Sequence, residues 1–227
     1  MIKPIFFMHI PRCGGTTFEQ VIEQAQLKTA PRMSWHDVLA ESAVASFTDY
    51  EFVSGHYPMA FRDWYVPQHC VVALIRNPID RVLSHYNYVH EHGYWRDPVY
   101  TEFCRNATLE EWLTDHISKR SASNLMTRFF AGDRYVDDLH KAIDHIETAC
   151  DLVYPVDRWG GMQGFADAVC RLADIRPLFV DDRHSNQSNH EQSRQNISKD
   201  MLARITELNA KDMALYEHVL DRRKETA

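Results

Sequence analysis

The sequence predicts an α/β fold in three layers, with helices on both sides of a central, mostly parallel sheet. Short apolar runs alternate with stretches of helical periodicity along the chain, as they do in βαβ units. Residues 70–75 (CVVALI) are apolar at every position, which is typical of a parallel strand buried on both faces. The 227 residues are 44% hydrophobic, which suits one domain spanning 1–227 with a full core.

The first third of the chain contains three expected strands. Residues 3–9 form an apolar run, residues 51–54 form a shorter one that ends at a Gly-His pair, and residues 70–75 form the third. A helix is expected over residues 16–27, because its apolar side chains fall on one face, and another over residues 35–47.

A further helix is predicted to begin at Asn77-Pro78, because Asn is a favoured N-cap residue and Pro suits the first helical position. Its apolar stripe would contain Ile79, Val82, Leu83 and Tyr86. Helices also fit 109–120, 122–131, 135–149 and 160–174, a strand fits 151–156, and Ser198 should cap one long final helix.

Composition excludes several classes of function. A net charge of −7 argues against a general binder of nucleic acid or membrane surfaces. No run reaches the roughly 20 apolar residues of a membrane span, and a strand so near the N-terminus leaves no room for a signal peptide. The cysteines are odd in number and form no CxxC pair, and no histidine falls in a zinc-type pattern. We therefore expect a reduced, cytoplasmic protein without metal or disulfides.

Three of the expected strands end at polar groups that could react with or bind a ligand: Arg12, His56 and Arg76. In open α/β sheets, ligands bind at the carboxyl ends of the strands. We expect these three side chains to share one crevice.

The segment Pro-Arg-Cys-Gly-Gly-Thr-Thr, residues 11–17, predicts a tight glycine loop that leads into a helix N-terminus. Such a turn presents backbone N–H groups and the positive end of a helix dipole to an anion, and Arg12 adds a positive charge. The GxxxxGK[ST] pattern of nucleotide kinases, whose hydroxyl holds magnesium, is absent. An ordinary strand-to-helix turn remains the alternative interpretation.

A second motif, RNPIDRVLSHY, spans residues 76–86. Arg76 follows a strand, and Ser84 lies two turns along the next helix, so that the two could hold one terminal phosphate. Arg81 could contribute as well, although a mid-helix arginine more often pairs with a nearby carboxylate.

Together, the two motifs resemble those of sulfotransferases that use 3′-phosphoadenosine 5′-phosphosulfate. The closer resemblance is to carbohydrate O-sulfotransferases of the heparan sulfate 2-O and 6-O type, which share the Gly55-His56 segment and the Asn-x-x-x-Arg…Gly segment of residues 124–132. The resemblance extends over 3–92 and, more weakly, 121–222, while residues 93–120 match no segment of that family. Arg12 stands where the family usually has lysine, a point charge rather than a planar fork.

This resemblance implies a P-loop-like fold, a role for each candidate residue and no metal. Arg12 would hold the 5′-phosphate and stabilise the departing charge, and His56 would act as general base. The other candidates for binding the 5′-phosphate are Cys13, Gly14, Gly15, Thr16 and Thr17, and those for the 3′-phosphate are Arg76 and Ser84. Further donor contacts would come from Arg183, Ser185 and Asn186, in a polar loop over residues 181–196. That loop could instead be a disordered linker. Asn124 and Arg128 would orient the substrate.

The expected function is sulfuryl transfer from 3′-phosphoadenosine 5′-phosphosulfate to a hydroxyl acceptor, a glycan or another small molecule, in a bacterial protein. Two alternatives stay open: a P-loop nucleotide kinase, and a module that binds 3′-phosphoadenine nucleotides without catalysis. Neither the acceptor nor the oligomeric state follows from the sequence.

Overall fold

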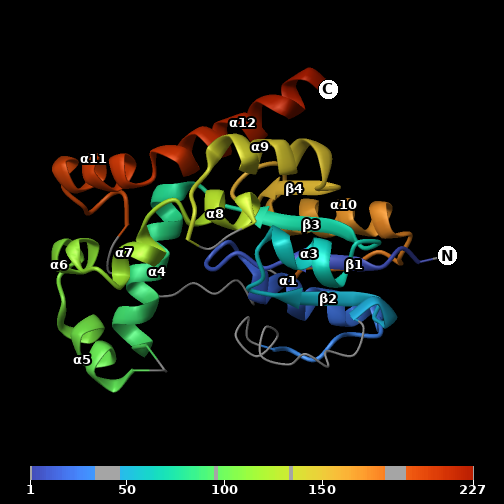
Figure 1. The fold of residues 1–227 in the computed structure, drawn as a ribbon, viewed down its shortest axis with the longest axis horizontal. Helices are drawn as coiled ribbons and strands as arrows, with labels where there is room; N and C mark the ends of the chain where they lie inside the picture. The colour runs from blue at the N-terminus through green and yellow to red at the C-terminus, as the bar shows by residue number, and fades with distance from the viewer. Residues whose placement is uncertain (1, 34–46, 95–96, 133–134, 182–192, 227) are drawn as a thin grey trace.

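The computed structural model describes residues 2–33, 47–94, 97–132, 135–181 and 193–226. Within these ranges it contains a four-stranded sheet in which all neighbouring strands are parallel. The order across the sheet is β2 (Phe52–Gly55), β1 (Ile5–Met8), β3 (Cys70–Ile75) and β4 (Leu152–Pro155). The predicted α/β fold with a parallel central sheet is therefore confirmed, and helices flank this sheet (Figure 1).

The helices of the described ranges follow the strands in βαβ fashion. In chain order they are α1 (Gly15–Ile22), α3 (Met59–Tyr65), α4 (Pro78–His92), α5 (Pro98–Asn106), α6 (Leu109–Thr114), α7 (Ser118–Ala122), α8 (Leu125–Ala131), α9 (Leu139–Thr148), α10 (Gly161–Ala173), α11 (Lys199–Leu208) and α12 (Ala210–Thr226), with the short 3₁₀ helices η1 (Glu23–Ala25) and η2 (Phe47–Asp49). The helix expected over residues 35–47 lies almost wholly outside the described residues.

Successive side chains of β1 pack on opposite faces of the sheet, as the alternation of a strand requires. The ring of Phe6 lies 5.3 Å from that of Phe61 in α3, while Phe7 lies 4.9 Å from Phe18 in α1 and 6.1 Å from Phe165 in α10. All five side chains are fully buried. These contacts explain why residues 5–8 are apolar at every position and place helices in a layer on each side of the sheet.

A second, smaller core forms around α4, on the side of the molecule where Figure 1 shows α5, α6, α7 and α11. Its buried members include Val82 and Tyr86 of α4, Cys104 of α5, Trp112 of α6 and Ile205 of α11. The segment 93–120, for which the sequence suggested no family counterpart, supplies two of these residues. This part of the chain therefore supports the outer face of α4.

Two predicted helices are each broken into two by a polar side chain. The helix expected over 109–120 divides into α6 and α7 because the Asp115 carboxylate accepts hydrogen bonds from the backbone N–H groups of Ile117 and Ser118. The final helix begins after the predicted cap, where Ser198 Oγ accepts from Met201 N at 3.1 Å, but it breaks at Asn209. The buried amide of Asn209 donates to the carbonyl of Ala122, 2.8 Å away. That long-range contact redirects the chain into α12.

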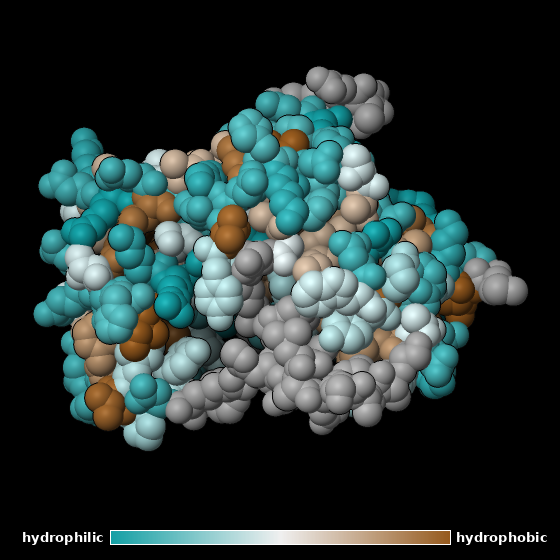
Figure 2. All heavy atoms as spheres, in the orientation of Figure 1, coloured by the Kyte–Doolittle hydropathy of each residue, from teal (hydrophilic) through white to brown (hydrophobic). Residues whose placement is uncertain are grey.

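The face shown in Figure 2 is mostly hydrophilic, with hydrophobic residues scattered among the polar ones. The large exposed apolar side chains come from separate elements, among them Trp64, Val99, Tyr135 and Phe179. Within the described ranges, no helix is both long enough and apolar enough to cross a membrane.

Candidate functional site

The three polar strand ends lie at one edge of the sheet. β1 pairs with β2 on one side and with β3 on the other, in register at Met8–Gly55 and Met8–Ala73. The chain adds β2 on one side of β1 and β3 on the other, so the direction of winding changes between β1 and β3. In open parallel sheets, ligands bind in the crevice at such a switch point. The loops that carry Arg12 and Arg76 flank this crevice, and His56 follows β2 beside it.

The glycine loop between β1 and α1 has the backbone that anion binding requires. Arg12 and Gly14 both have positive φ, 68° and 90°, and α1 begins at Gly15 without a side-chain cap. The first N–H groups of α1 therefore lack a capping side chain and can donate to an anion. Thr16 is exposed, and Thr17 is half-buried beside a small cavity lined also by Gln20 and Phe179.

Cys13 contributes less to the loop than its position suggests. Its N–H donates to the Ile10 carbonyl at 3.3 Å, and its side chain is fully buried. Burial raises the pKa of the Cys13 thiol to about 12, although the positive charges of Arg81 and Arg76 oppose the shift. The thiol therefore stays protonated near neutral pH, where a thiolate would be needed for attack.

We expect iodoacetamide to leave Cys13 unmodified in the native protein at pH 8, because the thiol is fully buried and its raised pKa keeps it protonated there. Peptide mass spectrometry of native and urea-unfolded samples measures the modification. Rapid labelling of native Cys13 at this pH would contradict the burial argument.

Arg12, Arg76 and Ser84 form one cationic group. Arg12 Nε donates to Ser84 Oγ at 3.1 Å, and Arg76 Nη1 lies 3.4 Å from the Arg12 carbonyl oxygen. Burial and the charge of Arg76 lower the pKa of Arg12. None of the ion pairs among the described residues involves either guanidinium. Two partly buried cations held together without a carboxylate favour an anionic ligand.

His56 is exposed at the end of β2, and its tautomer follows from its hydrogen-bond partner. Its Nδ1 lies 2.7 Å from the backbone oxygen of His9. A carbonyl can only accept, so Nδ1 carries the proton of the neutral ring and the lone pair resides on Nε2. This is the form in which an imidazole accepts a proton from a hydroxyl group.

Two further residues near the cationic group were missed by the sequence reasoning. The Arg12 guanidinium lies 4.6 Å from the ring centroid of Tyr88, and His85 follows Ser84 directly. Burial, together with the positive charges of Arg81 and Arg12, lowers the pKa of His85 to about 3. Tyr88 could have been found, since it lies four residues after Ser84 and so on the same helix face.

Arg81 lies in α4, where its charge acts on Cys13 and His85. It is fully buried, and its Nη2 donates to the Ser121 carbonyl at 2.8 Å. Burial lowers its pKa, an effect that the charge of Asp212 opposes. The structure thus places Arg81 between α4 and the segment leading to α8, as a structural cation.

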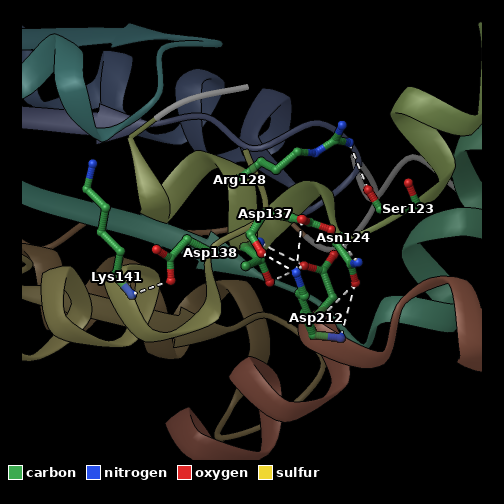
Figure 3. A network of polar contacts seen from close by, with 9 residues as sticks. Ser123, Asn124, Arg128, Asp137, Asp138, Lys141 and Asp212 are labelled. Carbon is green, nitrogen blue, oxygen red and sulfur yellow. Dashed lines mark hydrogen bonds and ion pairs between the residues drawn. The ribbon is translucent and has the colours of Figure 1, made fainter. Parts of the chain in front are cut away.

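Asn124 and Arg128 belong to a different polar network, which Figure 3 shows. Asn124 Oδ1 accepts from the backbone N–H groups of Lys211 and Asp212 at 3.1 and 3.3 Å, so it caps the start of α12. Its amide nitrogen donates to Asp137 at 3.0 Å. Arg128 is buried and donates to the backbone carbonyls of Ser123 and Arg120.

The hydrogen bonds of Asn124 tie the start of α8 to α12, and those of Arg128 tie α8 to the segment just before it. None of these bonds joins either residue to the cationic group. Beside the network lies an open cavity of about 700 Å³ that Asn124 lines together with Lys119, Asp137, Arg204 and Glu207. The remaining predicted donor contacts, Arg183, Ser185 and Asn186, lie outside the described residues. Within the described ranges, no group of three or more metal-ligating side chains is placed to hold a metal ion.

Comparison with known proteins adds one match. The model of the sulfotransferase family matches residues 3–142, more than half of the chain. The matched range includes the glycine loop, His56, and the Arg76 and Ser84 pair. A search of curated proteins found no match.

Proposed function

The chain belongs to the sulfotransferase family, and we propose that it transfers the sulfuryl group of 3′-phosphoadenosine 5′-phosphosulfate to a carbohydrate hydroxyl. One observation carries the choice of donor: Arg12, Arg76 and Ser84 meet at the crevice between β1 and β3. A donor with phosphate groups at both ends needs cations and hydrogen-bond donors from two separate segments, and the two loops supply them.

In this proposal, Arg76 and Ser84 bind the 3′-phosphate. Because Ser84 Oγ accepts from Arg12 Nε, its own hydrogen remains to be donated to a phosphate oxygen. The first N–H groups of α1 bind the 5′-phosphate. Arg12 lies between the two anions, so its charge also stabilises the phosphate oxygen from which sulfur departs.

Transfer then proceeds by in-line displacement. The acceptor oxygen forms a bond to sulfur as the bond between sulfur and the 5′-phosphate oxygen breaks. His56 Nε2 takes the acceptor proton, and the products are a sulfate ester and adenosine 3′,5′-bisphosphate. Catalysis of this kind depends on positioning and on stabilising the charge of the leaving group, which the arginines supply.

A carbohydrate acceptor is supported by the resemblance to carbohydrate O-sulfotransferases and by the surface beside Arg12. The Tyr88 ring is 41% exposed, and it stacks on His92 with centroids 4.7 Å apart. A partly exposed aromatic side chain next to a cationic group suits the mixed apolar and hydroxyl surface of a sugar ring.

The direct test is a transfer assay with ³⁵S-labelled 3′-phosphoadenosine 5′-phosphosulfate and a panel of oligosaccharides, in the presence of a chelator of divalent cations. We expect labelled sulfate ester and one equivalent of adenosine 3′,5′-bisphosphate. Donor binding without transfer to any acceptor would favour a non-catalytic binding module, and magnesium-dependent phosphoryl transfer from ATP would favour a kinase.

A further inference from the structure

The Glu19 carboxylate collects contacts from three separate segments around the candidate site. Its Oε1 accepts from Ser54 Oγ and lies 3.0 Å from His9 Nδ1, while Oε2 lies 2.7 Å from the Arg32 guanidinium. The side chain is only 17% exposed. Glu19 belongs to α1, the helix whose N-terminus forms the anion-binding turn, and His9 and Ser54 come from the carboxyl ends of β1 and β2.

His9 connects this carboxylate to both halves of the site. Its ring is 4% exposed and packs so closely on the glycine loop that a Cβ at Gly15 would lie 2.1 Å from His9 Cδ2. Its backbone oxygen accepts from His56 Nδ1, and the two imidazole rings meet edge to face at 4.5 Å. A shift of His9 would therefore move both the loop and His56.

Ser54 provides a second connection to His56, two residues further along the chain. Because Ser54 Oγ bonds to the same carboxylate oxygen as His9, Glu19 holds the ends of β1 and β2 at a set distance from α1. His56 is thus anchored twice, through the His9 carbonyl and through its own strand.

We infer that Glu19 is a positioning residue for sulfuryl transfer. It acts through His9 and Ser54 to hold the His56 imidazole in a fixed position relative to the glycine loop. The inference rests on the proposed function. Burial raises the pKa of Glu19, but the hydrogen bonds from His9 and Ser54 and the charges of His9 and Arg32 outweigh burial, so its pKa lies below the usual value. The carboxylate is therefore ionised at neutral pH and accepts from both partners.

The test is Glu19→Gln, which keeps the shape of the side chain but replaces an accepting oxygen by an N–H donor. We expect kcat to fall about 10- to 100-fold, because displacing a catalytic group by about 1 Å can lower the rate by up to about 100-fold. The KM for the donor and the affinity for adenosine 3′,5′-bisphosphate should change less than about 3-fold. Glu23→Gln, an exposed carboxylate one turn further along, is the matched control and should leave kcat unchanged.

A double-mutant cycle separates positioning from a general structural effect. If Glu19 acts through His56, Glu19→Gln should lower kcat much less in a His56→Ala background than in the wild type. An equal reduction in both backgrounds, or equal losses of kcat and donor affinity, would overturn the inference.

A second readout does not depend on activity. In the wild-type protein, ¹⁵N NMR of the His56 ring should report the Nδ1–H tautomer, and Glu19→Gln should shift the tautomer balance. If no sulfuryl transfer is found, the proposed function fails, yet this shift would still support the connection between Glu19 and His56. An unchanged His56 spectrum would overturn the connection itself.

Discussion

Replacing His56 with alanine is expected to lower kcat about 10²- to 10⁴-fold, the usual contribution of a positioned general base. The His9 carbonyl holds the proton of the neutral ring on Nδ1, so that Nε2 is the basic nitrogen. Alanine removes that nitrogen but none of the groups proposed to bind the donor. Affinity for adenosine 3′,5′-bisphosphate, measured by isothermal calorimetry, should therefore stay within about 3-fold of the wild-type value, since both arginines remain.

A surface histidine provides the control for this substitution. His116 is 88% exposed in the turn between α6 and α7, and His116→Ala should leave kcat unchanged. If His56→Ala instead weakens donor binding while kcat is preserved, His56 is a donor ligand and the base must be sought elsewhere.

Arg76→Ala should weaken binding of adenosine 3′,5′-bisphosphate about 10- to 100-fold, the equivalent of roughly 1.5–3 kcal/mol for a charged hydrogen bond. Binding of adenosine 5′-monophosphate should change less than about 3-fold, because that ligand lacks the phosphate that Arg76 is proposed to hold. Isothermal calorimetry with the two nucleotides measures both effects on the same variant.

The comparison also controls for the glycine loop, because Arg76 Nη1 lies near the Arg12 carbonyl. If removing Arg76 distorted the glycine loop, the affinity for adenosine 5′-monophosphate would fall as well. Equal losses for the two nucleotides would therefore refute the assignment of Arg76 to the 3′-phosphate. Arg105→Ala, at an exposed position of α5, is the matched control and should affect neither ligand.

Local signals predicted much of the fold. The expected strand over residues 70–75 coincides with β3, since a short run that is apolar at every position suits a parallel strand buried on both faces. The predicted caps are also present: Asn77 Oδ1 accepts from Ile79 N, and Ser198 Oγ accepts from Met201 N. Capping joins residues only two or three positions apart, so it can be recognised from the sequence.

Helix interruptions and some short helices were not predicted. The break at Asn209 depends on a hydrogen bond to Ala122, 87 residues earlier in the chain. α3 and α5 were absent from the prediction. α3 is held by the packing of Phe61 against Phe6, and α5 by its packing in the core around α4. Contacts between segments so far apart leave no periodic trace in either segment.

By itself, the sequence determined a parallel α/β sheet whose strand ends present Arg12, His56 and Arg76 at one edge, because apolar runs and turn residues act locally and parallel strands align their ends. Only the tertiary structure decided that Arg12 reaches Ser84 and Tyr88, that Asn124 caps α12, and that Glu19 joins His9 to Ser54. These contacts depend on how whole helices pack against the sheet. The free energy of that packing comes from the burial of two cores rather than from any one segment.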